Sequence, residues 1–214
     1  MIDRIIHYKY KGASIKTKFR HFCKQELLVL SKKANYQDKQ TIEILKKELL
    51  NIKSKRILLY CPIGLEVNIY PLIYQLRKQK GIKIFIPYVD RVSFKVVPFR
   101  LPLIKNQFNI FEPKQSLFYL TKIDTAIIPV LGIDKNFKRI GFGKGMYDRF
   151  FEMLKYRPNI IFVARKMMVS KDIITDSYDI LGDKFISNFC ATKRGIDDRI
   201  LSDRFYNIQY YNRK

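Results

Sequence analysis

The sequence has little of what marks a membrane or secreted protein. No apolar run approaches the roughly 18 residues of a membrane-spanning helix. Residues 1–12 mix charged residues with tyrosine and histidine and lack the apolar core of a secretory signal. The cysteines, Cys23, Cys61 and Cys190, are odd in number and far apart, which argues against a disulfide framework or a C-x-x-C metal site. We therefore expect a soluble protein of the reducing cytoplasm, with no membrane attachment.

Acidic residues are also scarce, because 19 Asp and Glu stand against 42 Lys and Arg and give a formal net charge of +23. Such an excess attracts nucleic acid, membrane surfaces or highly anionic small molecules, and it does not choose among them. The basic residues are spread along the whole chain, and no recognised RNA- or DNA-binding motif or aromatic-rich basic stripe accompanies them. A solvated surface and a nucleic-acid face both stay open, and we expect no specific nucleic-acid partner.

The 214 residues, 47% of them hydrophobic, are enough for one domain with a substantial core. Apolar residues at helical spacing predict a helix from Ile15 onward, on which Ile15, Phe19, Phe22, Cys23 and Leu30 form the apolar stripe, and a second helix over residues 42–52. Short apolar runs then predict strands at 57–61, 82–87, 125–130, 160–164 and 184–189, with helices after 68 and over 149–156.

This alternation of strands and helices predicts an α/β fold. We expect a single-domain, open, mainly parallel sheet with helices on both faces, formed by residues 14–214 and preceded by an N-terminal extension, residues 1–13. Ligands of such sheets bind at the carboxyl ends of the strands, where residues 61–66 and 129–147 are expected to lie.

The most informative stretch is R-I-G-F-G-K-G-M-Y-D-R-F-F, from Arg139 to Phe151. Its glycines, at 141, 143 and 145, leave the backbone free to turn successive N–H groups toward an anion. Apolar residues at 147, 150, 151 and 154 indicate a helix that begins where the loop ends, and Arg139, Lys144 and Arg149 add positive charge beside it. The loop suits phosphate, although it matches neither the Walker spacing nor G-x-G-x-x-G, and a glycine-rich turn with a basic rim stays open.

Three further positions have both a structural and a functional interpretation. Lys16 and Arg20 are four residues apart on one helix, so they form either a clamp for a polyphosphate or an ordinary exposed basic face. Asp148, in the first turn of the predicted helix, either favours the helix dipole or holds a divalent cation. Glu66 precedes a predicted helix and by itself reads as a surface acid.

The glycine segment resembles the R-[LI]-G-x-G-x-G-[YF]-Y-D signature of the 5-formyltetrahydrofolate cyclo-ligase family, whose members are also called methenyltetrahydrofolate synthetases. Lys16 to Arg20 resembles the family's K-x-x-x-R, and Glu66-Val67 resembles its Y-x-x-x-x-E-V segment, with one extra residue between Tyr60 and Glu66. Residues 109–113, N-I-F-E-P, resemble G-I-x-E-P, and residues 128–134 resemble the strand and turn before the glycine loop. The similar segments span roughly residues 15–188.

The resemblance implies an ATP- and Mg²⁺-dependent cyclisation of 5-formyltetrahydrofolate, with or without a polyglutamate tail, to 5,10-methenyltetrahydrofolate, with release of ADP and phosphate. It implies catalytic roles for Lys144 and Arg139, and Mg²⁺ ligation by Asp148 and Asp179. The substrate-binding residues would be Glu66, Phe142, Lys144 and Tyr147, although Tyr147 is equally interpreted as a core residue. The ATP-binding residues would be Lys16, Arg20, Arg139, Ile140, Gly141, Phe142, Gly143, Lys144, Gly145, Met146 and Tyr147.

The sequence departs from the family pattern at Met146, which replaces an aromatic residue, and at Tyr178, which replaces the histidine of an H-D pair. A glutamine that often follows one of the strands is absent around residues 165–167. These departures bear on substrate stacking and turnover more than on ATP binding. Two alternatives stay open: a basic nucleic-acid-binding protein on the same fold, and a family member that binds ATP and folate with a divergent activity.

Overall fold

The computed structural model describes residues 14–107, 110–113, 122–188 and 190–195. The expected extension, residues 1–13, lies outside these ranges, as do Asn109 and Phe189. The helices are α2 (Ile15–Leu30), the short 3-10 helix η1 (Ser31–Lys33), α3 (Ala34–Ile52), α4 (Tyr70–Arg77) and α5 (Met146–Glu152). The strands are β1 (Arg56–Leu58), β2 (Lys83–Asp90), β3 (Ser93–Pro98), β4 (Leu103–Lys105), β5 (Phe111–Pro113), β6 (Thr125–Pro129), β7 (Gly132–Ile133), β8 (Arg139–Ile140), β9 (Asn159–Val163), β10 (Lys184–Ile186) and β11 (Ala191–Lys193).

The main sheet has seven strands in the order β11-β10-β9-β6-β1-β2-β3. The five strands from β10 to β2 are parallel to their neighbours, whereas β3 and β11 pair antiparallel at the two edges. Two small antiparallel pairs, β4 with β5 and β7 with β8, stand apart from this sheet. The prediction of an open, mainly parallel sheet is confirmed.

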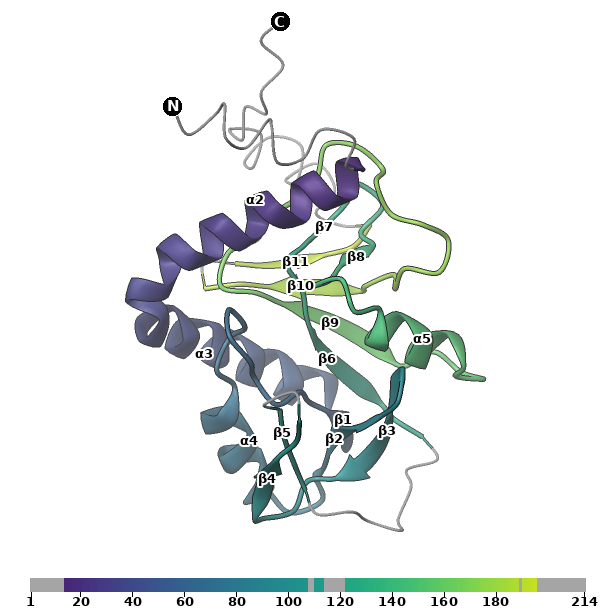
Figure 1. The fold of residues 1–214 in the computed structure, drawn as a ribbon. Coiled ribbons are helices and arrows are strands. Elements are labelled where there is room, and N and C mark those ends of the chain that lie inside the picture. Colours follow the sequence, from purple (N-terminus) through teal and green to yellow (C-terminus); the bar gives the residue numbers. More distant parts are fainter. Residues whose placement is uncertain (1–13, 108–109, 114–121, 189, 196–214) are drawn as a thin grey trace, which may run out of the picture.

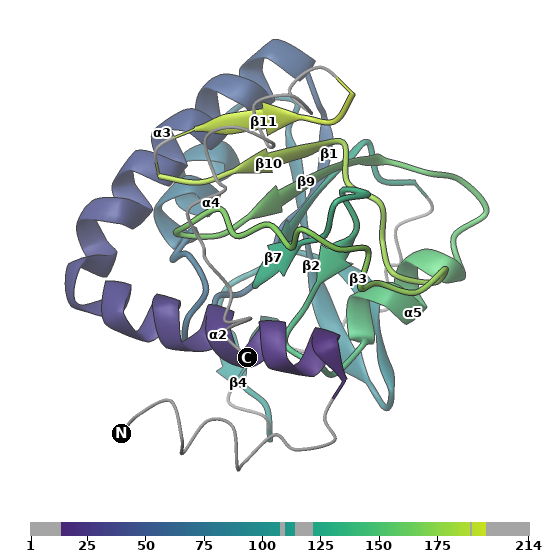
Figure 2. The same ribbon diagram turned by 90° about the horizontal axis from the view of Figure 1, so that it is seen from above.

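Both faces of the sheet are buried. Successive side chains of a strand point to opposite faces, so Ile127 and Ile161 pack in the cluster with α3 and α4, while Ile128 and Phe162 pack in the cluster with α5. Figures 1 and 2 show α3 and α5 on opposite sides of the sheet. The predicted arrangement of helices on both faces is thus confirmed, and it explains why these strands read as continuous apolar runs.

Helix α2 lies across one end of the molecule, beside the β7–β8 pair (Figure 1). Ser14 caps it, because the Ser14 Oγ accepts a hydrogen bond from the Thr17 N–H at 3.3 Å. Its buried stripe consists of Phe19, Cys23 and Leu27, and it packs against the glycine-loop side of the core. Ile15, which we placed on this stripe, is 64% exposed, because the helix begins there at its solvent-facing end.

Element boundaries differ from those predicted. Helix α5 ends at Glu152 rather than at 156, since the Leu154 N–H donates to the Phe151 carbonyl in the tighter i to i−3 pattern that closes a helix. Strand β10 ends at Ile186, where the Ser187 N–H bonds the Cys190 carbonyl and turns the chain into β11. The antiparallel strands β3 to β5 and β11 were not predicted.

Candidate active site

The glycine loop connects β8 to α5 at the carboxyl end of the central strands. Gly143 and Gly145 have φ of 109° and 64°, a region that side chains disfavour. Gly145 is the residue before α5, and Asp148 lies in the first helical turn, as predicted. Two of the three glycines therefore adopt the left-handed backbone conformation expected of them, and the third, Gly141, has a different role.

Gly141 is needed because the Arg139 guanidinium passes over it. A Cβ atom at Gly141 would lie 2.2 Å from Arg139 Nη1. The guanidinium is buried, donates from Nη1 to Asp148 Oδ2 at 3.1 Å and from Nη2 to the Pro129 carbonyl at 3.2 Å, and lies 5.1 Å from the centre of the Tyr147 ring. The buried Arg139 and Asp148 and the half-buried Tyr147 thus form one unit beneath the loop.

Two polar atoms of this unit are unsatisfied. Arg139 Nε and Asp148 Oδ1 are buried and have no hydrogen-bond partner among the described residues. Buried polar groups are nearly always paired, and the exceptions are explained by strain, a catalytic role, or a bound water, ion or ligand. A donor beside an acceptor at the loop suits a phosphate oxygen and a cation, respectively.

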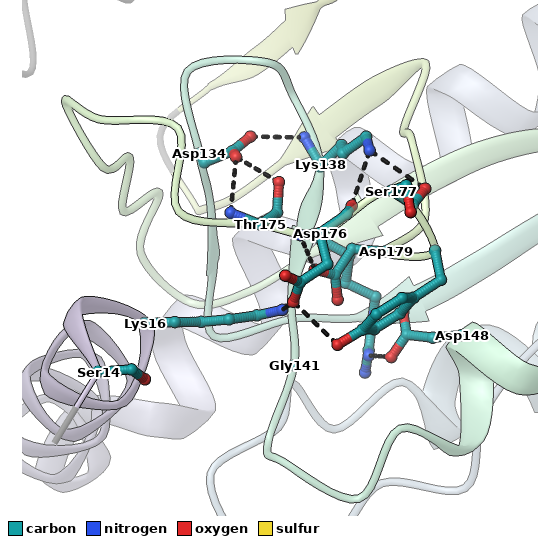
Figure 3. Close-up of polar contacts among 12 residues, drawn as sticks. Ser14, Lys16, Asp134, Lys138, Gly141, Asp148, Thr175, Asp176, Ser177 and Asp179 are labelled. Carbon is teal, nitrogen blue, oxygen red and sulfur yellow. Dashed lines mark hydrogen bonds and ion pairs between the residues drawn. The ribbon is translucent and has the colours of Figure 1, made fainter.

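Helix α2 brings two cations to the loop. Arg20 donates from Nε to the Gly141 carbonyl at 3.1 Å, and Lys16 donates from Nζ to Asp176 Oδ2 at 2.9 Å and also to Asp179 Oδ2 (Figure 3). Burial lowers the pKa of Lys16, but the contacts with Asp176 and Asp179 outweigh burial and leave that pKa above its usual value. Of the predicted pair, Arg20 therefore contacts the loop, and Lys16 is held by the carboxylates of Asp176 and Asp179.

The segment 175–179 forms the acidic wall of the site. The Asp176 N–H donates to Asp179 Oδ2 at 2.6 Å, and the Tyr178 hydroxyl donates to Asp176 Oδ2 at 2.9 Å. The bond from Lys16 is the main reason that the pKa of Asp176 lies below its usual value. Asp179 is thus held by Lys16 and by the Asp176 N–H, and its role as a metal ligand stays a prediction. Asp176 was not predicted, because nothing in its local sequence marks it.

Glu66 follows β1 and lies within electrostatic reach of Arg139. Its Oε2 accepts a hydrogen bond from the Ile63 N–H at 2.9 Å. Burial raises the pKa of Glu66 to about 7, against the lowering effects of that hydrogen bond and of the charges on Arg139 and Arg165. Burial, and next the charge of Glu66, raise the pKa of Tyr147 as well. A carboxyl group that can exchange a proton near neutral pH thus stands beside the Arg139 unit.

The remaining loop residues differ in what they offer. Lys144 is exposed, and its carbonyl accepts from Arg149 Nη2 at 2.7 Å. Arg149 also donates from Nε to the Val92 carbonyl at 2.7 Å, so it fastens the loop to the β2–β3 turn. Ile140 is fully buried, and Phe142 packs against the α2 cluster. Met146, the first residue of α5, packs against the buried cluster that contains Phe94 and Phe150. Ile140 therefore presents only its backbone to a ligand.

Asp148 and Asp179 are the two carboxylates predicted to hold a metal. Within the described ranges, no group of three or more His, Cys, Asp and Glu side chains is placed to bind a metal ion. An Mg²⁺ ion usually takes one or two carboxylates and completes its shell with water and phosphate oxygens, so a magnesium site does not need a third side-chain ligand. In the same part of the chain, no helix is long and apolar enough to cross a membrane.

Comparisons with known proteins agree with the resemblance seen in the sequence. The model of the 5-formyltetrahydrofolate cyclo-ligase family matches residues 13–184. The 5-formyltetrahydrofolate cyclo-ligase of Mycoplasma pneumoniae is 32% identical over 134 residues, which cover 63% of this chain and 73% of that protein.

Solved structures share the fold. The 5,10-methenyltetrahydrofolate synthetase of Aquifex aeolicus superposes with a TM-score of 0.70 at 24% identity, covering 84% of this chain and 92% of that one. A 5,10-methenyltetrahydrofolate synthetase from Mycoplasma pneumoniae superposes with a TM-score of 0.65 at 25% identity, covering 81% of this chain and 99% of that one.

Proposed function

The chain belongs to the 5-formyltetrahydrofolate cyclo-ligase family, and we propose that it converts 5-formyltetrahydrofolate to 5,10-methenyltetrahydrofolate while ATP is cleaved to ADP and phosphate. The observation that carries the proposal is the buried Arg139–Asp148 unit under the glycine loop, with an unsatisfied donor and an unsatisfied acceptor on adjoining groups. Both are atoms that a bound nucleotide and its cation would satisfy.

The proposed reaction has two steps. The formyl oxygen attacks the γ-phosphorus, the bond to the β-phosphate oxygen breaks, and ADP leaves. The N10 nitrogen then attacks the activated formyl carbon and loses its proton to solvent, and the bond from that carbon to oxygen breaks, so the phosphate departs with the former formyl oxygen as the ring closes. Neither step needs a covalent bond to the protein, so the side chains act by positioning the reactants and by stabilising charge.

Arg139, Lys144 and the loop amides would hold the triphosphate. Arg139 is fixed by Asp148, Pro129 and Tyr147, so its guanidinium is already oriented beneath the loop before a phosphate binds. Lys144 is exposed at the tip of the loop, where a flexible cation can follow the charge that develops on the transferred phosphoryl group. Lys16 and Arg20 add charge from α2.

Asp148 and Asp179 would hold Mg²⁺, and the unpartnered Asp148 Oδ1 fits a cation. The ion would supply charge neutralisation at the phosphates. Asp179 is paired with Lys16, so this carboxylate would serve both the lysine and the ion. The folate end would lie toward Glu66, which would orient the formyl group, with Phe142 and Tyr147 beside the pterin. Tyr147 also packs edge-on against Phe94, with ring centres 5.0 Å apart, so it serves the core as well.

Phosphate release in four reaction mixtures tests the proposal. One mixture is complete, and the other three lack ATP, Mg²⁺ or 5-formyltetrahydrofolate, respectively. We expect release only in the complete mixture, with one phosphate for each methenyltetrahydrofolate formed. Phosphate release that needs no folate would indicate a divergent ATP-cleaving activity instead.

A further inference from the structure

Arg165 follows β9 at the same sheet edge as the Glu66 segment, and its guanidinium is buried. It makes four hydrogen bonds, two to a carboxylate and two to backbone carbonyls. Nε and Nη2 donate to Asp38 Oδ1 and Oδ2 at 2.7 and 3.0 Å, while Nη1 and Nη2 donate to the carbonyls of Leu65 and Glu66 at 3.0 and 2.7 Å. A planar guanidinium can bridge these groups, and the single ammonium of a lysine cannot.

The Asp38 carboxylate also binds the other end of the Glu66 segment. Asp38, on α3, accepts a third bond at Oδ2 from the Asn68 N–H at 3.0 Å. The Tyr60 hydroxyl donates to the Val67 carbonyl at 2.9 Å. The backbone from Leu65 to Asn68 is therefore bonded at every residue, and the side chain of Glu66 projects from its middle.

We propose that Arg165 and Asp38 are positioning residues of the folate site, which hold the Glu66 backbone so that its carboxylate keeps its place beside Arg139. This inference rests on the proposed function, in which Glu66 orients the formyl group. Arg165 acts on the substrate through Glu66, because four of its five N–H groups bond Asp38 and the two carbonyls. It follows that a change at Arg165 should affect folate binding and not ATP binding, because the residues proposed to bind ATP lie on the glycine loop and α2.

A second arginine–aspartate pair provides a matched control. Arg56 donates to Asp124 Oδ1 from Nε at 3.1 Å and from Nη2 at 2.7 Å, where β1 begins and just ahead of β6. This pair joins two strands at the opposite, amino edge of the sheet. It shares the ion-pair chemistry of the Arg165–Asp38 pair but neither its place nor its burial, since its side chains are 38% and 28% exposed against 6% and 7%. Arg56→Lys therefore reports what weakening a partly exposed ion pair away from the site does to the fold.

The test is a double-mutant cycle between Arg165→Lys and Glu66→Gln, in which folate binding, the Michaelis constant for folate and the Michaelis constant for ATP are measured for each variant. Arg165→Lys is expected to weaken folate binding about tenfold or more, since a misplaced orienting group carries losses of that order. The Michaelis constant for ATP should change less than about twofold. In the Glu66→Gln background Arg165→Lys should weaken folate binding little further, because the carboxylate that Arg165 positions is already gone. Arg56→Lys should leave both Michaelis constants unchanged.

The inference would be overturned if Arg165→Lys weakened folate binding equally in the wild-type and Glu66→Gln backgrounds, or if it raised the Michaelis constants for ATP and folate in parallel. Either result would mark Arg165 as a residue of the fold alone. Asp38→Asn provides the second route if Arg165→Lys does not fold, and the same pattern is expected of it. Absence of both folate binding and turnover in the unmodified protein would overturn the proposed function together with the inference. Normal turnover with additive losses would overturn only the inference.

Discussion

Gly141→Ala is the substitution whose effect the structure defines most sharply. The φ angle of Gly141 lies outside the positive range, so alanine does not strain the backbone. Its Cβ would, however, stand 2.2 Å from Arg139 Nη1 and 2.5 Å from Cζ, and the guanidinium must move. Arg139 then loses its bond to Asp148, and a hydrogen bond between charged groups contributes about 1.5–3 kcal/mol.

We expect Gly141→Ala to lower the free energy of unfolding by about 2 kcal/mol, which is roughly 6 °C in Tm for a chain of this length. Turnover should fall on the order of a hundredfold, because a pre-oriented cation is displaced. The control is Gly81→Ala, between α4 and β2, where φ is 87° and a Cβ would meet nothing within 4 Å. Backbone strain there costs about 1–3 kcal/mol, so Tm should fall similarly while turnover stays unchanged. If the two variants have equal turnover, the role assigned to Arg139 is wrong.

The remaining predictions concern charge. Lys144→Ala should lower turnover on the order of a hundredfold and ATP affinity much less, and a loss confined to ATP affinity in initial-rate titrations would make Lys144 a binding residue only. Asp148→Asn should lower the rate in a way that added Mg²⁺ partly restores; unchanged Mg²⁺ curves with a lower Tm would make Asp148 a partner of Arg139 and nothing more. Because burial raises the pKa of Glu66 from 4.5 to about 7, the folded protein holds a proton that the unfolded chain releases, and the free energy of unfolding should fall as pH rises through that window, by about 3 kcal/mol at most. Urea unfolding of Glu66→Gln should lack this decrease, and a slope equal to that of the unmodified protein would remove Glu66 as its source. Nucleic acid should bind only weakly, with an affinity that falls steeply as salt rises, and tight, sequence-selective binding at physiological salt would favour the nucleic-acid alternative.

The sheet could be predicted from the sequence because its central strands are buried on both faces. Runs such as residues 125–130 and 160–164 are apolar at nearly every position for that reason. The edge strands β3 and β11 could not be predicted, because they are short or interrupted by polar residues and their pairing depends on distant partners. The start of α5 was predictable from Gly145, whose positive φ ends the loop.

The candidate site could be predicted where its residues are close together in the sequence. It could not be predicted where distant segments come together only in the folded chain. The glycines, Arg139 and Asp148 lie within ten residues, and their pattern carries the signal. Lys16 and its partners Asp176 and Asp179 are about 160 residues apart, and Arg165 and Asp38 are 127 apart. Spacing along the chain cannot reveal such pairs, because they form only when α2 and α3 dock on the sheet. Arg165 was noted only as lying where a family glutamine is absent.

The most direct test of the proposed cyclisation is the absorbance of 5,10-methenyltetrahydrofolate in a mixture of the purified protein, ATP, Mg²⁺ and 5-formyltetrahydrofolate. We predict that the absorbance rises with time, that the rate is proportional to protein concentration, and that Gly141→Ala reduces it on the order of a hundredfold. No rise above a protein-free control, with ATP binding demonstrated in the same preparation, would contradict the proposed activity.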